Sequence, residues 1–379
     1  GNEPNDQKKG SCIQVSYGDI QPTILGFTLK DAGNPSWNDA RGSALKITNS
    51  SSATIINMIF ADADSEPFAA SSNGTAGPVK LYNCIFYGTK RGPTFFGNDG
   101  NIGLEIYNSV FANNAQAGIR YSNSNYNPVV KNSIFYNNDL EGTGQKDVFG
   151  SVDITYSIYD GGTGNNLSVN PNFVDPANNN FRLSGTSPAI GAGNSSGTHP
   201  TDILGNARPS PANTNPDMGA YENALSERQE GVTLSVDKTM ILENADVSTI
   251  KATLSAAINQ DVVVSLSASG TATGNGKDYT LSSNTITIPS GSTTATATLT
   301  GVKDEIVDNN ETVILAITSV SNAAEVGNQE VTITINDLYD SYPEVSLSLD
   351  KNDILEGTDG LRAEGIATGT VSILSPFLS

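Results

Sequence analysis

The sequence is poor in basic residues and contains a single histidine. Its 379 residues include 20 Lys and Arg against 40 Asp and Glu, which gives a formal net charge of −20 at pH 7. Because nucleic acids and anionic membrane surfaces are bound through basic patches, neither is expected as a partner. An acidic surface attracts divalent cations instead, although most of the charge is expected to form an ordinary solvated surface.

Cysteine is also scarce, and the chain has only Cys12 and Cys84. Two cysteines cannot build a disulfide framework, and their spacing is not that of a zinc site. No apolar run reaches the about 18 residues of a membrane-spanning helix, so we expect no membrane insertion. The chain begins at Gly1 without a signal-peptide pattern. Either a signal has been removed or the chain is an internal fragment, and we favour the fragment.

Helical periodicity is absent as well, and its place is taken by a repeat of about two dozen residues. An Asn opens and a Phe closes four similar tetrads, at residues 57–60, 83–86, 108–111 and 132–135. Residues 156–159 are a less faithful fifth copy, with Tyr in place of both Asn and Phe. The aromatic positions 60, 86, 111, 135 and 159 are spaced by 26, 25, 24 and 24 residues.

A fixed period of this length is typical of a solenoid in which each repeat forms one coil. Coils stack about 4.8 Å apart, so equivalent residues are expected to lie directly over one another. The aromatic residues would then form an apolar file, and the Asn side chains a ladder bonded to the coils above and below. We predict an all-β protein that begins with a right-handed parallel β-helix over residues 1–164.

The repeat ends after Tyr159, and residues 165–225 are rich in Asn, Pro and Gly. Their motifs are NPNFVD at 170–175, FRLS at 181–184, SPAIGAG at 187–193, DILGNARP at 202–209 and DMGAYE at 217–222. These residues closely resemble the C-terminal signature of bacterial right-handed β-helix proteins of the choice-of-anchor Q group. The resemblance implies an exported β-helix and no particular activity. We expect the segment to cap the last coil, where a solenoid exposes unpaired backbone and an apolar cross-section.

A different residue pattern follows a charged linker at residues 226–231. Apolar and polar residues alternate at 262–266, 294–299 and 331–335, a pattern typical of strands with one buried face. We predict one antiparallel Ig-like β-sandwich over residues 232–340. Its opening, residues 232–238, is echoed at 345–351, so residues 341–379 are interpreted as an incomplete second copy. A third of a sandwich cannot bury a core, and we expect it to be poorly ordered or loosely docked.

Within the sandwich, a succession of short motifs carries a second resemblance. GTAT at 270–273, DY at 278–279, ITIPSG at 286–291, VKDE at 302–305 and ET at 311–312 are similar to the Calx-beta motif of sodium–calcium exchangers and of many bacterial adhesin-like proteins. Family members commonly bind calcium at one end of the sandwich. By position, the resemblance implies the calcium ligands Glu243, Asp278, Asp304, Asp308 and Asp337.

Physical chemistry supports Ca²⁺ as the cofactor of these loops. Carboxylates from separate loops that meet at one end repel one another unless a cation lies between them, and calcium prefers six to eight oxygen ligands. Lys303 and Asn336 stand where the family often has acids, which predicts weaker binding or fewer ions.

Parallel β-helices also include polysaccharide lyases and hydrolases, so the coils were considered as a catalytic surface. A lyase needs a cationic group and a base, for which the candidates are Lys90 with Arg91, Lys131, and Arg120 with Tyr121. A hydrolase needs two carboxylates, for which the candidates are Asp62 with Asp64, spaced to share a strand face, and Asp153 with Asp160. The only histidine, His199, falls in the cap. None of these residues stands in a motif of pectin-cleaving enzymes, so we predict no enzyme activity.

The sequence therefore predicts a structural or adhesive protein that is extracellular or attached to a bacterial cell surface. The β-helix would present a glycan- or protein-binding face, and the Calx-beta modules would form a calcium-stiffened stalk. The alternative is a polysaccharide lyase or glycoside hydrolase that carries Calx-beta modules as accessories.

Overall fold

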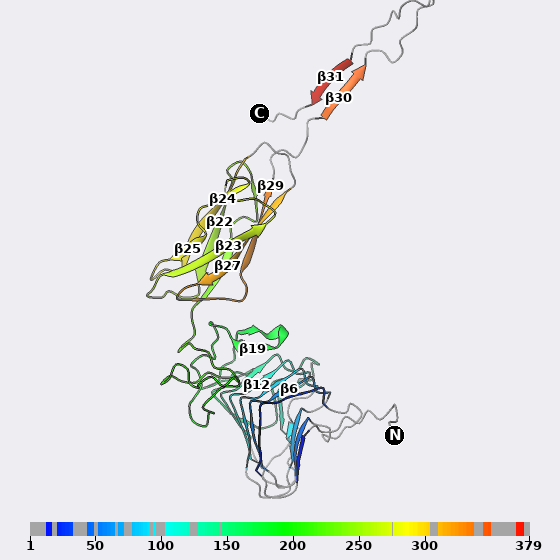
Figure 1. Cartoon of the computed structure of the whole chain (residues 1–379), viewed down its shortest axis with the longest axis vertical. Coiled ribbons are helices and arrows are strands. Elements are labelled where there is room, and N and C mark those ends of the chain that lie inside the picture. The colour runs from blue at the N-terminus through cyan, green and yellow to red at the C-terminus, as the bar shows by residue number, and fades with distance from the viewer. Residues whose placement is uncertain are drawn as a thin grey trace, which may run out of the picture. The chain divides into compact units, whose positions relative to one another are not determined.

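The computed structural model describes residues 13–16, 21–32, 44–48, 52–64, 67–71, 78–90, 94–95, 103–121, 128–144, 146–274, 276–303, 310–336, 344–349 and 369–374. The chain forms two compact units, Gly1–Gly231 with Asn322–Gly327, and Val232–Ser321 with Asn328–Ser379. Both consist of strands (Figure 1), which confirms the all-β class. The one helical element among the described residues is a 3-10 turn, Pro176–Asn178, and no described helix could cross a membrane.

Three parallel sheets, here called sheets I, II and III, build the first unit, and successive strands belong to each in turn. Sheet I contains β1 (Ile13–Ser16), β4 (Leu45–Thr48), β7 (Phe68–Ser71), β10 (Thr94–Phe95), β13 (Ile119–Tyr121) and β16 (Val148–Phe149). Sheet II contains β2 (Thr23–Leu25), β5 (Thr54–Ile56), β8 (Val79–Tyr82), β11 (Leu104–Tyr107), β14 (Val129–Lys131) and β17 (Asp153–Thr155). Sheet III contains β3 (Thr28–Lys30), β6 (Ile59–Ala61), β9 (Ile85–Tyr87), β12 (Val110–Ala112) and β15 (Ile134–Tyr136).

The aromatic residues of the repeat stack in register along sheet III, as the period predicts. Phe60 pairs with Phe86, Phe86 with Phe111, and Phe111 with Phe135. Their ring centroids are 4.6, 5.0 and 4.7 Å apart, with nearly parallel planes. Tyr159 is partly buried against the same core. One coil therefore contributes one ring to the file, an arrangement consistent with a β-helix.

The Asn ladder predicted for residues 57, 83, 108 and 132 is wrong for most of its length. Each of these Asn residues adopts a left-handed φ, between 48° and 55°, at the turn from sheet II to sheet III. Asn tolerates this conformation better than most residues do. Only the Asn83 amide donates to the neighbouring coil, to Asn57 Oδ1 at 2.9 Å. A coil-to-coil ladder runs instead through Thr89, Asn114 and Asn138.

A serine ladder also joins the coils at the position that follows the repeated Asn. The backbone N–H of Cys84 donates to Ser109 Oγ at 3.1 Å, that of Ser109 to Ser133 Oγ at 3.2 Å, and that of Ser133 to Ser157 Oγ at 3.0 Å. Cys84 itself is fully buried, and its burial raises the pKa of the thiol to about 12. A thiol in such an environment is inert, so Cys84 acts as a packing residue.

The outer face of sheet III is apolar, and residues 165–225 cover it. Ile85, Val110, Ile134 and Ile158 form this outer file and pack against residues such as Phe173, Phe181, Ile190 and Met218. The segment contains one antiparallel pair, β18 (Phe173–Asp175) with β19 (Asn180–Leu183). The sequence predicted that this segment caps the last coil. The structure shows instead that it extends along sheet III. A parallel sheet with two apolar faces requires cover on both.

Two further sheets, here called IV and V, form the second unit. Sheet IV has the order β24 (Tyr279–Leu281), β26 (Thr294–Gly301), β22 (Val247–Leu254), β20 (Gly231–Val236) and β28 (Ala324–Glu325). Sheet V has the order β21 (Met240–Leu242), β29 (Glu330–Asn336), β27 (Glu311–Val320), β23 (Val262–Gly270) and β25 (Thr285–Ile288). Burial alternates along these strands, as in β22, which confirms the predicted period of two.

The last strands of the chain form a separate antiparallel pair. β30 (Glu344–Leu349) pairs with β31 (Gly369–Leu374) over six residues each. Residues 350–368, between the two strands, lie outside the described residues. In the part of the chain that the structure describes, the segment predicted to begin a second sandwich therefore contains one two-stranded sheet.

Candidate functional site

The acidic residues of the sandwich were predicted to meet at one end, and the structure places two of the five. Glu243 follows β21 and is 4% exposed, and Asp278 precedes β24 and is 9% exposed. Both flank Gly301, the last residue of β26. A Cβ on Gly301 would lie 2.3 Å from the carbonyl oxygen of Leu242 and 3.2 Å from the Cα of Glu243. Tyr279, next to Asp278, pairs with Gly301 across sheet IV.

Asp304, Asp308 and Asp337 lie outside the described residues, but the strands that lead to them end at the same place. β26 ends at Gly301, and Val302 donates to the carbonyl of Asp278 at 2.9 Å. β29 ends at Asn336, whose carbonyl accepts from the backbone N–H of Glu243 at 3.3 Å. The topology therefore brings the two placed carboxylates together with both strand ends.

The side chains at this end suit a hard cation. The Oδ1 of Asn336 is buried and has no hydrogen-bond partner among the described residues, and it belongs to a class of oxygen that calcium accepts. Glu311, which opens β27, pairs with Ile335 beside it and has a buried carboxylate oxygen. Sequence matching assigned neither residue as a ligand. The signal that could have found Glu311 is its place at the start of the strand that pairs with the end of β29.

Carboxylate oxygens at this end are also partly engaged by the protein itself. The Asp278 carboxylate accepts a hydrogen bond from the backbone N–H of Thr273, which closes the loop before β24. Asp246, at the same end, accepts from Lys238 Nζ at 2.5 Å, and this bond lowers the pKa of Asp246. Among the described residues, no group of three or more His, Cys, Asp or Glu side chains could hold a metal ion.

The cationic candidates for a lyase site are distributed over different sheets. Arg120, on sheet I, lies over the ring of Phe149 at 5.2 Å, and its neighbour Tyr121 is 4% exposed within the core. Lys131, on sheet II, donates to Asn194 Oδ1 at 2.8 Å and to the carbonyl of Ser196 at 2.9 Å. Lys90 is exposed after β9 of sheet III, and Arg91 lies outside the described residues. The structure does not bring these side chains together.

The carboxylate candidates for a hydrolase are separated as well. Asp62 and Asp64 were expected to share a strand face, but β6 ends at Ala61 and Asp62 adopts a left-handed φ of 50° in the turn. Asp62 is paired with Lys30 at 3.4 Å. Asp153 is exposed on β17, whereas Asp160 contacts Lys146 beyond that strand.

The only histidine lies in residues 165–225, as expected, beside the coils. Its Nδ1 is 3.1 Å from the carbonyl oxygen of Thr201, and its ring is 6.0 Å from that of Tyr82. Tyr82 in turn stacks on Tyr107 at 5.2 Å. His199 therefore packs this segment against sheet II.

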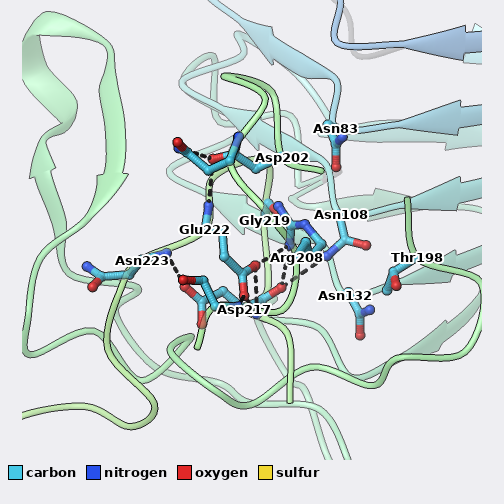
Figure 2. Close-up of polar contacts among 12 residues, drawn as sticks. Asn83, Asn108, Asn132, Thr198, Asp202, Arg208, Asp217, Gly219, Glu222 and Asn223 are labelled. Carbon is cyan, nitrogen blue, oxygen red and sulfur yellow. Dashed lines mark hydrogen bonds and ion pairs between the residues drawn. The ribbon is translucent and has the colours of Figure 1, made fainter. Parts of the chain in front are cut away.

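A buried polar network, shown in Figure 2, lies within residues 202–223 and was not predicted from the sequence. Arg208 and Glu222 form an ion pair at 3.1 Å in which both side chains are fully buried. Arg208 also donates to the carbonyl of Asp217 at 2.9 Å and to that of Gly219 at 3.1 Å. Asp202 accepts from the backbone of Leu204, Asn206 and Glu222.

Three carboxylates interact with this one guanidinium, and burial perturbs the pKa of two of them. Burial and the neighbouring Glu222 raise the pKa of Asp217 to about 7, although its oxygens accept from the backbone of Gly191 and Asn223. Burial likewise raises the pKa of Glu222. These acids are enclosed by backbone donors of their own segment, so the network holds the segment together.

The repeated Asn side chains connect this network to the coils (Figure 2). Asn108 donates to the carbonyl of Asp217 at 3.0 Å, as Figure 2 shows. Asn83 likewise donates to the carbonyl of Thr201 at 2.8 Å, and Asn132 to that of Asn194 at 2.8 Å. Gly219 returns a backbone bond to the carbonyl of Asn132 at 2.8 Å. Asn at these turns therefore anchors residues 165–225 to the coils.

Sheets IV and V thus form a β-sandwich that is antiparallel except for the pair of β21 with β29, with buried acidic residues at the end where four strands meet. Residues 227–339 match the family model of the Calx-beta domain, and this part of the chain is a Calx-beta domain. Calx-beta domains are known as calcium-binding modules.

Solved structures that resemble the chain include two Calx proteins. The apo form of the Calx CBD1 domain is 14% identical, with a TM-score of 0.26, and the match covers 29% of this chain and 98% of that one. CBD12 from CALX1.2 is 12% identical, with a TM-score of 0.27, and the match covers 38% of this chain and 70% of that one. No curated protein matches the chain.

Proposed function

We propose that this chain belongs to an extracellular or surface-attached modular protein with a structural or adhesive role. Residues 1–164 form a right-handed parallel β-helix that presents a binding face for a glycan or protein. Residues 165–225 are its choice-of-anchor Q type cover. The Calx-beta domain binds calcium and stiffens a stalk that a second, here incomplete, copy continues.

One observation carries the calcium assignment: Glu243, Asp278 and the unpartnered Asn336 Oδ1 belong to strand ends that meet at Gly301. Burying two carboxylates at the point from which two more acidic loops depart is costly without a countercharge. A bound cation supplies that countercharge. Calcium fits best because Glu243, Asp278 and Asn336 all offer oxygen ligands from a loop or a strand end.

The catalytic alternative has less support in this part of the chain. Arg120 and Lys131 belong to different sheets, Lys90 lies beyond the end of β9, and Lys131 is occupied by residues 194–196. A lyase requires such groups within reach of one sugar unit. We therefore retain the structural or adhesive role.

Thermal melts with calcium and with a chelator test the assignment. A ligand at 100 times its Kd stabilises the bound state by about 2.7 kcal/mol, so the sandwich transition should rise with millimolar calcium and the β-helix transition should not. Glu243→Gln should abolish the shift. Asp261→Asn is the matched control, because Asp261 precedes β23 at the opposite end of the sandwich. Identical melts with calcium and chelator would refute the assignment.

A further inference from the structure

A cavity of about 300 Å³ lies at the end of the coils, between β15, the turn around Asp160 and residues 168–171. Its floor is apolar, since the lining residues Phe135 and Ile158 are only 3% and 1% exposed. Polar and aromatic residues complete the lining, among them Tyr136, Asn137, Asp147, Tyr159, Ser168 and Asn170. Ligand pockets span about 300–1,000 Å³, so this one suits a ligand of the size of a single sugar unit.

Unused hydrogen-bonding capacity lines the cavity. The buried Asp147 carboxylate accepts one bond on each oxygen, from Asn138 Nδ2 at 2.9 Å and from the backbone N–H of Asp160 at 2.8 Å. A carboxylate offers about four acceptor positions, so about two remain. Asn137 spends its amide nitrogen on Asn113 Oδ1 at 3.0 Å, which leaves its own carbonyl oxygen as an acceptor.

Donors complement these acceptors on the opposite wall. Asn170 accepts from the backbone N–H of Asn172 at 2.9 Å, and no described residue accepts a bond from its amide nitrogen. Ser168 Oγ accepts from Gly161 at 3.1 Å, which leaves its hydroxyl hydrogen free to donate. The cavity thus combines an apolar floor with separate acceptors and donors at its edge.

This combination matches the chemistry of a sugar ring, which has an apolar C–H face and hydroxyl groups that both donate and accept. Tyrosine is suited to such a surface because its ring is apolar and its hydroxyl is polar. A protein that presents a glycan-binding face needs a site of this kind, so the inference rests on the proposed function.

Charge decides which sugars fit. Lys146 contacts Asp160 at the rim and balances its charge. Asp147 is buried, and burial raises its pKa. An added carboxylate would nevertheless stand beside two acids, and an added cation would meet Lys146. We propose that this cavity binds one neutral hexose or N-acetylhexosamine unit at the end or at a branch of a glycan.

Saturation-transfer NMR on the whole chain tests the proposal with a panel of methyl glycosides. The panel contains methyl glucoside, galactoside, mannoside and fucoside, the methyl N-acetylhexosaminides and, as the anionic comparison, methyl glucuronide. At least one neutral glycoside should give a saturable signal at millimolar concentration, and the glucuronide should give none. No signal from any neutral glycoside, or a signal from the glucuronide alone, would overturn the proposal.

Two variants locate the site. Ser168→Trp places a large side chain at the exposed rim and should remove the signal without changing the melting temperature. Asn137→Gly keeps the left-handed φ of 51° and removes one acceptor, which should weaken binding about five-fold. Asn113→Gly is the matched control, because it breaks the same Asn137–Asn113 bond but leaves the cavity lining intact.

An unchanged signal in Ser168→Trp would place the sugar elsewhere and would refute this site. The calcium-dependent melt of the sandwich is measured separately. A failure of sugar binding with an intact calcium shift would therefore reject this cavity and not the calcium-binding module.

Discussion

Removing the charge of Arg208 should cost more than removing that of Glu222, although the two form one buried ion pair. Arg208→Met removes the cation that interacts with Asp202, Asp217 and Glu222. Breaking a buried pair in this way costs about 3–5 kcal/mol. The expected loss is at the upper part of this range, because three acids lose their countercharge at once.

Glu222→Gln should be milder, because Arg208 keeps two carbonyl partners and another acid. Its guanidinium still donates to Asp217 and Gly219, and the side chain of Gln can still accept from the backbone N–H groups of Ser210 and Asp217. The negative charge of Glu222 contributes to the raised pKa of Asp217. Its removal therefore lowers the pKa of Asp217, and the ionised Asp217 carboxylate then balances the charge of Arg208. A loss of about 1.5–3 kcal/mol is expected, that of a hydrogen bond to a charged group.

Hydrogen exchange of the amides in residues 200–222 measures both losses locally, without requiring the two units to unfold together. Because 1.4 kcal/mol is a factor of ten, protection should fall by about 1,000-fold or more in Arg208→Met and by about 10- to 150-fold in Glu222→Gln. Lys30→Met removes the exposed pair with Asp62 and serves as the control, with little change expected. Equal losses, or a larger loss in Glu222→Gln, would refute the view that one cation serves several acids.

Two further outcomes follow from the first unit. Phe111→Ala removes a fully buried ring that is stacked between two others. It should lower the free energy of unfolding, measured in urea, by about 3–5 kcal/mol. Phe149 is 39% exposed, so Phe149→Ala should cost less than about 1 kcal/mol. Asp217 has a folded-state pKa of about 7, above its ordinary value of 3.8, so its contribution is present at low pH and is lost as pH rises through about 7. Urea midpoints of this unit should therefore rise as the pH falls from 8 to 5. The free energy of unfolding should change by at most about 1.4 kcal/mol per pH unit, and Asp217→Asn should reduce this change. A midpoint independent of pH in the wild-type chain would contradict this reasoning.

The sequence predicted the coils because each repeat places one Phe at the same point of each coil. Register follows directly from such a period, since a shift of one residue would bury different side chains. The alternation in the sandwich was equally informative, since one buried face is the simplest explanation of a period of two. Both predictions rest on patterns within short stretches of the sequence, which determine the side chains that each strand buries.

Other features depend on contacts that no local pattern reveals. The Arg208 network joins residues that are neighbours in sequence, but its burial comes from coils that lie more than sixty residues earlier, through Asn108 and Asn132. Asp62 and Asp64 were assigned to one strand face by their spacing alone. A left-handed residue after Ala61 ended the strand and removed that relation. Residue spacing predicts a shared strand face only within a strand, so the prediction fails where the strand ends.

The sequence did contain the signal for the cover of sheet III. Each tetrad places Ile or Val directly before the Phe, and adjacent residues of a strand point to opposite faces. Two apolar residues in succession therefore mean two apolar faces, one packed inside the coil and one needing a partner outside it. Interpreted in this way, the tetrad requires a segment that lies along the sheet as well as over its end.

The repeated Asn has a structural role in addition to forming the turn. Its left-handed φ turns the chain from sheet II to sheet III, and its amide reaches the carbonyl groups of residues 194, 201 and 217. Gly would satisfy the turn alone, but it has no side chain with which to hold the covering segment. At the end of the same turn series, Tyr156 occupies the position with a φ of 50°, lies under Lys131 and packs against the apolar cluster of the covering segment. The identity of the turn residue therefore follows from what lies outside the coil, and the repeat encodes its cover as well as its core.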